Sequence, residues 1–330
     1  MKNILVIGGA GYVGSSLVRK LLIQNYNVIV YDLFLYKENV FEDLKNSKNL
    51  KCIKGDIRNI SKIETCLDNI DCIIHLACIS NDPSYELNPD LGKSINFECF
   101  YPLLKALKKF KINKFLYASS SSVYGVKKED SVTEELKLEP LTDYSHFKVE
   151  CENILRNFNH KNLEKIILRP ATVCGYSKRQ RLDVIVNILS NHAYFNKKII
   201  VHGGNQLRPN IHIDDMCDAY IHLLNFKNDL NNEIFNVGFE NHSVTKLAQM
   251  TKDASADDVK ISTQKVFDER SYKINSNKIV NKTEFKTKKT VQNAIEDLIK
   301  AFQNRQLVDT FDDDSFYNIQ IIKKKIDQLI

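Results

Sequence analysis

The chain has 330 residues, 43% of them hydrophobic, which is enough to bury the core of one large α/β domain or of one domain with a smaller partner. Its 47 basic and 41 acidic side chains leave a net charge of +6, and its lysine-rich patches are short and scattered, so we expect no nucleic-acid partner. No apolar run approaches the roughly 18 residues that suggest a membrane span, and none has the pattern of a signal peptide. We therefore expect a cytoplasmic protein with no membrane partner.

The eight cysteines and eight histidines do not form a pattern typical of metal binding. The cysteines mostly lie in apolar segments and include no C-x-x-C pair, as expected of small core residues in a reducing compartment. Among the histidines, only the run His212-Ile213-Asp214-Asp215 resembles a set of ligands. Its apolar alternation with Ile211 favours a structural role, so we predict no metal site.

From the N-terminus to about Arg169, apolar strand-like runs alternate with amphipathic helical patterns. This alternation predicts an α/β fold with a Rossmann-type doubly wound parallel sheet. The predicted strands are 3–7, 27–31, 50–53, 72–76, 114–119 and 164–168. The predicted helices are 15–24, 61–68, 94–109 and 144–158.

Two of these helices, 94–109 and 144–158, carry more apolar side chains than one stripe against a sheet requires. The surplus fits a partner subunit, which would give a homodimer through these two helices. On pattern alone it fits a wide core face equally well.

After Pro170 the regular alternation ends, and the pattern predicts a smaller C-terminal α/β substrate lobe. Its predicted elements are a polar loop at 175–181, helices at 183–193, 214–226, 243–252 and 290–302, and strands at 198–202 and 233–237. The chain would then divide into a Rossmann domain at 1–170, with returning segments near 205–237, and a second lobe at 171–330.

The turn after the first predicted strand has the spacing of a dinucleotide-binding loop. Gly8 allows the turn, Gly11 lets backbone N–H groups approach a pyrophosphate, and Gly14 lets the following helix pack on the strand. The residues that we expect around the cofactor here are Gly8, Gly11, Tyr12, Val13 and Gly14.

The second predicted strand ends at Asp32, where a carboxylate can accept hydrogen bonds from ribose hydroxyls. The same carboxylate would repel a 2′-phosphate, and no arginine follows it in the chain. NAD is therefore favoured over NADP, and 1–170 is the predicted NAD-binding domain.

A tyrosine and a lysine, Tyr144 and Lys148, lie four residues apart and so share one face of a predicted helix, where the ammonium can stabilise a phenolate. To act as a base near neutral pH, the phenol must shift its pKa from about 10 toward about 7, a differential stabilisation of roughly 4 kcal/mol. The ammonium and a positive nicotinamide ring together could supply it. A serine hydroxyl from the strand end at 119–122 would then orient the substrate alcohol for hydride transfer to the cofactor.

Together these features resemble the extended short-chain dehydrogenase/reductase family, in particular its NAD-dependent nucleotide-sugar epimerase/dehydratase branch. The resemblance covers nearly the whole chain. The matching motifs are Gly8-x-x-Gly11-x-x-Gly14, Asp32, Asp56-Ile57, His75-Leu76-Ala77, Asn96, the run from Ser119 to Gly125, Tyr144-x-x-x-Lys148 and Arg169-Pro170.

The resemblance implies further cofactor contacts. According to this resemblance, Asp56 and Ile57 contact the adenine of the cofactor. It also places Ala77 and Asn96 along the cofactor channel and Pro170 beside the nicotinamide.

The resemblance also assigns the catalytic hydroxyl to Ser120, which completes a catalytic set with Tyr144 and Lys148. The neighbouring Ser121 and Ser122 are then substrate-side residues or, alternatively, hydrogen bonders at the strand end.

In the second lobe, the resemblance implies that Arg208 and Arg270 meet the diphosphate of a nucleotide. Two guanidinium groups suit this task because their planar forks match phosphate oxygens. For either arginine alone, a surface salt bridge is the alternative. Arg179 and Arg181 are weaker candidates, because the loop around them aligns poorly.

Two departures from the branch narrow the expected chemistry. Its 4,6-dehydratases follow the catalytic hydroxyl with Asp-Glu, an acid/base pair that eliminates water, whereas this chain has Ser121-Ser122, so dehydration is disfavoured. Its 4-epimerases often carry an Asn that helps to hold the nucleotide-sugar where this chain has Thr172. Thr172 stays a candidate substrate contact, and the identity of the sugar stays open.

We therefore expect an NAD-dependent nucleotide-sugar epimerase that acts through a 4-keto intermediate, with a nucleotide-diphosphate sugar as its substrate. The alternative is a nucleotide-sugar 4-dehydrogenase or 4-keto reductase, which shares the same catalytic residues. A non-enzymatic NAD-binding sensor is disfavoured, since it could dispense with Tyr144 and Lys148.

Overall fold

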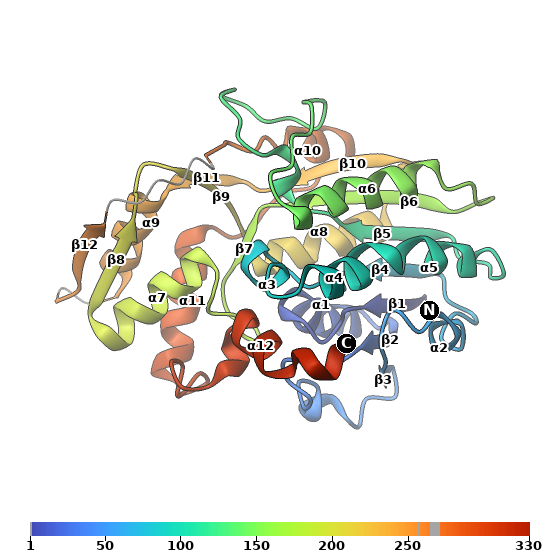
Figure 1. The fold of residues 1–330 in the computed structure, drawn as a ribbon, viewed down its shortest axis with the longest axis horizontal. Coiled ribbons are helices and arrows are strands. Elements are labelled where there is room, and N and C mark those ends of the chain that lie inside the picture. The colour runs from blue at the N-terminus through green and yellow to red at the C-terminus, as the bar shows by residue number, and fades with distance from the viewer. Residues whose placement is uncertain (1, 256–257, 265–270) are drawn as a thin grey trace.

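The computed structural model describes residues 2–255, 258–264 and 271–330. It is built around a seven-stranded sheet in the order β10-β6-β5-β4-β1-β2-β3, in which every neighbouring pair is parallel (Figure 1). The strands are β1 (Asn3–Ile7), β2 (Asn27–Asp32), β3 (Leu50–Lys54), β4 (Cys72–His75), β5 (Lys114–Ala118), β6 (Glu164–Pro170) and β10 (Glu233–Val237). The strand order reverses between β1 and β4, the kind of switch point at which open α/β sheets bind ligands. The predicted doubly wound parallel sheet is confirmed.

The sheet is covered on both faces, because apolar side chains along each strand point alternately to two helical layers. In β1, Ile4 and Val6 face one layer while Leu5 and Ile7 face the other, and all four are fully buried. Burying each such side chain stabilises the fold by about 1.5–3 kcal/mol, which fixes the position of the loop that follows β1. The first layer contains α1 (Tyr12–Ile23) and α8 (Ile213–Asn225), and the second contains α2 (Ile60–Glu64), α5 (Phe100–Leu107), α6 (Asp143–Asn157) and α12 (Asn318–Leu329).

The predicted helix at 94–109 is wrong in detail. A short helix α4 (Pro89–Lys93) begins earlier, with the side chain of Asn88 accepting a hydrogen bond from the Leu91 backbone N–H. It continues through a π-helical turn η2 (Ser94–Glu98) into α5. Single π turns of this kind occur frequently at functional sites. Another short helix, α3 (Asp82–Tyr85), was not predicted.

The second lobe combines helices with two small sheets. The helices are α7 (Ile185–Asn196), α9 (Val244–Ala254), α10 (Asn277–Thr283) and α11 (Val291–Gln303), and the short 3-10 turns of the chain are η1 (Glu42–Leu44), η3 (Ser121–Tyr124) and η4 (Asp314–Phe316). The small sheets are β11-β9-β7 and β12-β8, formed by β7 (Thr172–Cys174), β8 (Lys198–His202), β9 (Leu207–His212), β11 (Glu240–Ser243) and β12 (Lys260–Gln264). The predicted helices and strands of this lobe are present with slightly shifted ends, whereas β7, β9, β11, β12, α10 and α12 were not predicted.

Two elements of the second half return to the first. Strand β10 pairs with β6 of the main sheet, and helix α8 packs on α1. Both fall within or beside the returning segments predicted near 205–237, while a domain boundary at residue 170 stays a prediction. Within the described residues, no helix is both long and apolar enough to cross a membrane.

Candidate active site

A cavity of about 400 Å³ lies at the carboxyl ends of β1, β2, β4 and β5. The segment 172–184 and helices α6, α8 and α12 also contribute residues to its walls. This is the edge of the sheet where the switch point predicts a ligand site.

The predicted dinucleotide loop forms one end of the cavity, which Gly8, Gly11, Tyr12, Val13 and Gly14 line. Gly8 has a φ of +84°, which disfavours any side chain, and a Cβ atom at Gly14 would lie 2.5 Å from the Gly8 carbonyl oxygen. Helix α1 therefore starts close against the β1 turn, with Gly11 as its N-cap residue and no acidic residue in its first turn. Its first N–H groups are available to an anion.

Asp32 lies beside this loop at the end of β2. Its carboxylate accepts hydrogen bonds from the backbone N–H groups of Ala10, at 2.9 Å, and Phe34, at 2.8 Å. Burial raises the pKa of Asp32, while these two bonds and the charge of Arg179 act in the opposite direction. No arginine follows Asp32 directly in the chain, but the fold brings the charge of Arg179 near it from the second lobe.

Two of the residues that the resemblance placed at the cofactor do not line the cavity. Asp56 is held by the Arg58 guanidinium, with an Nη2–Oδ2 distance of 2.7 Å. The Asn96 amide is bonded to the backbone of Ile79, donating to its oxygen at 2.9 Å and accepting from its nitrogen at 2.8 Å. Because both Asn96 hydrogen bonds go to this loop, Asn96 fixes the loop after β4 rather than forming the wall. Ile57, Ala77 and Pro170 do line the cavity.

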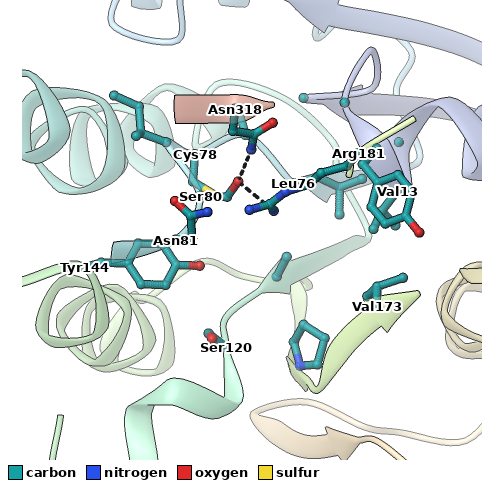
Figure 2. A pocket seen from close by; sticks show the side chains of 18 of the residues that line it. Val13, Leu76, Cys78, Ser80, Asn81, Ser120, Tyr144, Val173, Arg181 and Asn318 are labelled. Atoms are coloured by element: carbon teal, nitrogen blue, oxygen red, sulfur yellow. Dashed lines mark hydrogen bonds between the residues drawn. The ribbon is translucent and has the colours of Figure 1, made fainter. Parts of the chain in front are cut away.

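The predicted catalytic residues meet at the other end of the cavity. Ser120 follows β5, while Tyr144 and Lys148 lie on α6 and come from a distant part of the chain (Figure 2). A capping box formed by Thr142 and Ser145 starts α6 and so sets the position of Tyr144 in the first turn.

Tyr144 is half-buried, and removal of its hydroxyl from water holds the pKa of the phenol well above its usual value. The charge of Arg181 and the nearby Ser120 hydroxyl act in the opposite direction on this pKa. Lys148 lies 5.8 Å from the centre of the tyrosine ring, and its ammonium donates to the Ala118 carbonyl at 2.7 Å. The described residues alone therefore raise this pKa, and the lowered value expected of the base fits the addition of further positive charge, such as that of a nicotinamide ring.

A buried network supports the strand end that carries Ser120. The neighbouring Ser119 hydroxyl donates to Glu152, and the Arg169 guanidinium holds both oxygens of that carboxylate, with distances of 3.0 Å from Nε and 2.6 Å from Nη2. Arg169 also donates to the Tyr124 hydroxyl at 2.8 Å. Glu152 lies on α6 and bonds to Ser119, so it couples the tyrosine helix to the serine loop. Arg169 holds Glu152 in this position from β6.

Of the predicted substrate contacts, Ser121, Ser122 and Thr172 line the cavity. Arg208 is half-buried on β9, donates to the Leu207 carbonyl at 3.1 Å and is not among the described residues that line the cavity. The other predicted arginine, Arg270, lies outside the described residues.

Sequence reasoning missed several residues that line the cavity. These are Tyr36, Ser80, Asn81, Asp82, Tyr272 and Asn318, and the arginines ranked as weaker, Arg179 and Arg181, line it too. Tyr272 shares a hydrogen bond with Ser121, with 3.0 Å between the two oxygens. Asn81 has a φ of +75°, which an asparagine tolerates better than most residues. The one sequence signal for it is its position shortly after the motif His75-Leu76-Ala77.

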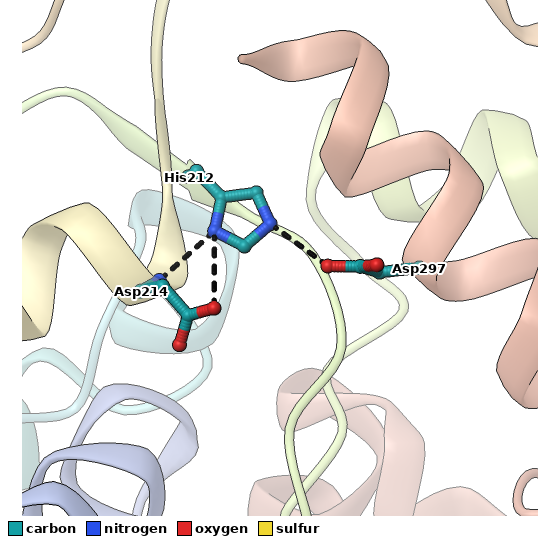
Figure 3. A group of neighbouring side chains, drawn as sticks. All are labelled: His212, Asp214 and Asp297. Carbon is teal, nitrogen blue, oxygen red and sulfur yellow. Dashed lines mark hydrogen bonds and ion pairs between the residues drawn. The ribbon is translucent and has the colours of Figure 1, made fainter. Parts of the chain in front are cut away.

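The cluster His212, Asp214 and Asp297 is the one arrangement in the described residues that resembles a metal site (Figure 3). The His212 Nδ1 atom accepts from the Asp214 backbone N–H at 3.0 Å, and its Nε2 atom lies 3.2 Å from Asp297. The ammonium of Lys289 lies 2.9 Å from Asp297. Since His212 caps α8 and a lysine already neutralises the carboxylates, a structural role accounts for the cluster.

Comparison with known proteins identifies the family. The sequence model of the NAD dependent epimerase/dehydratase family matches residues 4–238. A putative UDP-glucose 4-epimerase from Methanocaldococcus jannaschii is 31% identical over 242 residues, which cover 71% of this chain and 76% of that protein. The chain belongs to the NAD dependent epimerase/dehydratase family.

Two further matches extend this result. A UDP-glucose 4-epimerase from Lactobacillus helveticus is 27% identical over 72% of this chain and 76% of its own length. The crystal structure of UDP-glucuronic acid 4-epimerase from Bacillus cereus, in complex with UDP-glucuronic acid and NAD, superposes with a TM-score of 0.80 at 25% identity. The match covers 92% of this chain and 99% of that one.

The cavity fits NAD, the cofactor of the family. The glycine loop leaves the start of α1 open to a pyrophosphate, and a Cβ atom at Gly8 or Gly14 would collide with backbone. Asp32 has its carboxylate fixed by two backbone N–H groups at the cavity wall, as a ribose acceptor requires. The chain is therefore an NAD-dependent enzyme of this family.

Proposed function

We propose that this protein is an NAD-dependent nucleotide-sugar epimerase that acts through a 4-keto intermediate. The observation that carries the proposal is that Ser120 and Tyr144 face one cavity whose other end is the dinucleotide loop (Figure 2). Its relatives with 4-epimerase names, including the Bacillus cereus enzyme bound to UDP-glucuronic acid, support a nucleotide-diphosphate sugar as the substrate.

In this reading, the Tyr144 phenolate takes the proton of the sugar hydroxyl, and the resulting phenol later returns it. Ser120 lines the same cavity as Tyr144 and orients the same sugar hydroxyl. Lys148 is anchored on the Ala118 carbonyl and keeps a positive charge near the phenol. Bound NAD supplies a hydride acceptor that becomes a hydride donor, so the overall reaction needs no external oxidant.

The acidic groups of the cavity argue against dehydration. Asp32 and Asp82 are the carboxylates among the described residues that line the cavity. Asp32 is held at the dinucleotide end, and Asp82 accepts a hydrogen bond from Thr142 at 2.6 Å. The positions after Ser120 carry hydroxyls, with the Ser122 side chain donating to Ser120 at 2.8 Å. Elimination of water needs an acid and a base together beside the sugar, and these two carboxylates do not form such a pair.

The proposal includes contacts with the substrate in the second lobe. Ser121, Ser122 and Thr172 would face the sugar from the cavity wall. Arg208 and Arg270 would hold the diphosphate, because their guanidinium groups match phosphate oxygens.

A homodimer through the 94–109 and 144–158 segments is also part of the proposal. Most of the apolar side chains of α5 are buried within the chain, which accounts for much of the apolar surplus. Support comes from the half-buried rings of Phe97 and Phe147, stacked with 4.9 Å between their centres, and from Tyr101, which is 47% exposed. Sedimentation of the purified protein tests it, and a monomer at all concentrations would contradict it.

The function is tested by incubating the purified enzyme with UDP-, GDP-, CDP- and dTDP-sugars. Absorbance at 340 nm and the products are recorded together. Epimerisation predicts a sugar inverted at C4 with no net rise in absorbance, since hydride is returned. Net formation of NADH with release of a keto sugar would show a 4-dehydrogenase instead.

A further inference from the structure

Helix α12 lies outside residues 4–238, the part of the chain that the family model matches. Both ends of this helix nevertheless line the cavity, Asn318 at its start and Leu329 at its end. The two ends of the helix therefore contribute to the wall of the cofactor site, and Figure 1 shows α12 beside the β2 and β3 end of the sheet.

At the start of α12, Asn318 is 2% exposed and joins three segments of the cavity wall. Its Nδ2 atom donates to the Ser80 hydroxyl at 2.9 Å, and its backbone N–H donates to Asp183 at 2.9 Å. Its Oδ1 atom accepts from the Arg179 guanidinium. Arg181 donates to the same Ser80 hydroxyl at 3.2 Å, so one amide organises both arginines of the loop (Figure 2).

The rest of α12 is tied to the loops after β2 and β3. The Lys325 ammonium donates to the Leu35 carbonyl at 2.9 Å. The Leu329 carbonyl accepts from Arg58 at 2.5 Å, and Arg58 is the residue that holds Asp56. The side chains of Ile322 and Leu329 are buried in the same core as Ile57. Every one of these attachments is to a loop that borders the cavity.

Arg179 is the group that Asn318 most directly controls. Its side chain is 2% exposed, lines the cavity, and stacks with its guanidinium carbon 4.0 Å from the centre of the Tyr36 ring. Its Nε atom has no hydrogen-bond partner within the described residues. Burial lowers the pKa of Arg179 to about 10, although the charges of Tyr36, Asp183 and Asp32 act in the opposite direction. A buried guanidinium with an unfilled donor beside a nucleotide loop suits an anionic group of the ligand.

We propose that α12 is a retaining element of the NAD site and that Asn318 is the positioning residue through which it acts. Asn318 holds Arg179 and Ser80 in the cavity wall, and the hydrophobic contacts of Ile322 and Leu329 hold the helix in place. NAD therefore dissociates slowly while α12 is docked, and dissociates quickly when the helix detaches.

The first test measures NAD dissociation from Asn318→Ala, which removes both side-chain hydrogen bonds. Bound NAD is chased with excess unlabelled cofactor and its release is followed with time, without any sugar present. We expect release at least about fivefold faster than from the wild type, because hydrogen bonds to a charged group typically contribute about tenfold or more. The matched control is Gln328→Ala, an exposed position on the same helix, which should release NAD at the wild-type rate. A smaller increase for Asn318→Ala, or an equal one for Gln328→Ala, overturns the proposal.

The second test needs no variant and so stands even if Asn318→Ala fails to fold. Lys323, Lys324 and Lys325 are trypsin sites on α12, whereas Lys227 is an exposed site in a loop away from the cavity. In the wild type, added NAD should slow cleavage at the α12 lysines and leave cleavage at Lys227 unchanged. Equal rates at α12 with and without NAD would mean that the helix is not coupled to the cofactor. Since neither test uses a sugar, the proposed epimerase activity can fail while this inference holds, and the reverse.

Discussion

The two ends of the cavity are assembled in different ways. At the dinucleotide end, the seven residues from Gly8 to Gly14 form the phosphate loop by local geometry, and Asp32 is added by the neighbouring strand. At the substrate end, hydroxyls at Ser120 and Tyr144 come from separate segments, and the facing residues come from the second lobe. The phosphate loop is thus encoded in a short stretch of chain, whereas the catalytic set exists only once distant segments have folded together.

Substitution of Tyr144 should show this difference most clearly, because it should lower turnover without changing cofactor binding. Tyr144→Phe should retain NAD while turnover falls by about 10²–10⁴, the usual contribution of a positioned acid or base. Cofactor content after denaturation and steady-state turnover measure the two effects. Turnover within about threefold of the wild type would remove Tyr144 from the mechanism.

A substitution in the buried network should weaken the connection between the two segments that form the substrate end. Glu152→Gln leaves the Arg169 charge without its partner in a buried site, where both side chains are at most 3% exposed. The free energy of unfolding should fall by about 3–5 kcal/mol, measured by denaturant titration. The control is Glu150→Gln, two residues away and exposed on the same helix, which should change stability by less than about 0.5 kcal/mol. Equal stability of both variants would show that the ion pair does not support the serine loop.

At the substrate end, Arg208→Ala tests whether the second lobe holds the diphosphate. Nucleotide-sugar binding should weaken by about 1.5–3 kcal/mol, the range for hydrogen bonds to charged groups, while NAD binding stays the same. Calorimetry with a nucleoside diphosphate measures the first effect, and exposed Arg305→Ala is the control. If Arg208→Ala binds the diphosphate as well as the wild type does, Arg208 is not part of the clamp. In that case Arg181, which lines the cavity, becomes the first arginine to test.

The sequence predicted the main sheet well because its signals are local. Each strand of the first half is a short apolar run, and the glycine spacing requires only that Gly8 lie between a strand and a helix, which the structure confirms. The Tyr144 to Lys148 spacing is similarly local, since four residues make one turn of a helix.

The features that were missed depend on contacts between distant segments. Asn96 was predicted to line the cofactor channel, whereas its side-chain amide bonds to the backbone of Ile79, a contact that a helical pattern does not indicate. The charge of Arg179 acts on Asp32 from the second lobe, and Asn318 contacts Ser80 from the last helix, so neither interaction has a sequence signal. The raised pKa of Tyr144 likewise arises from burial, which follows from the complete fold.

The smallest expected effect concerns Asp32. It tests whether the choice between NAD and NADP is set by the glycine loop and β2 alone. The carboxylate is fixed against the backbone of the glycine loop, so a 2′-phosphate would meet a like charge in a buried setting. The protein should bind NAD about tenfold or more tightly than NADP, a difference of about 1.4 kcal/mol, as measured by calorimetry on cofactor-free protein. The substitution Asp32→Ala should remove most of this preference for NAD, because Arg179 then lies near the 2′-phosphate of NADP without the opposing carboxylate. Equal affinities of the wild type for the two cofactors would mean that Arg179 already offsets the carboxylate. The second lobe would then control cofactor choice, and the dinucleotide end would depend on tertiary contacts as the substrate end does.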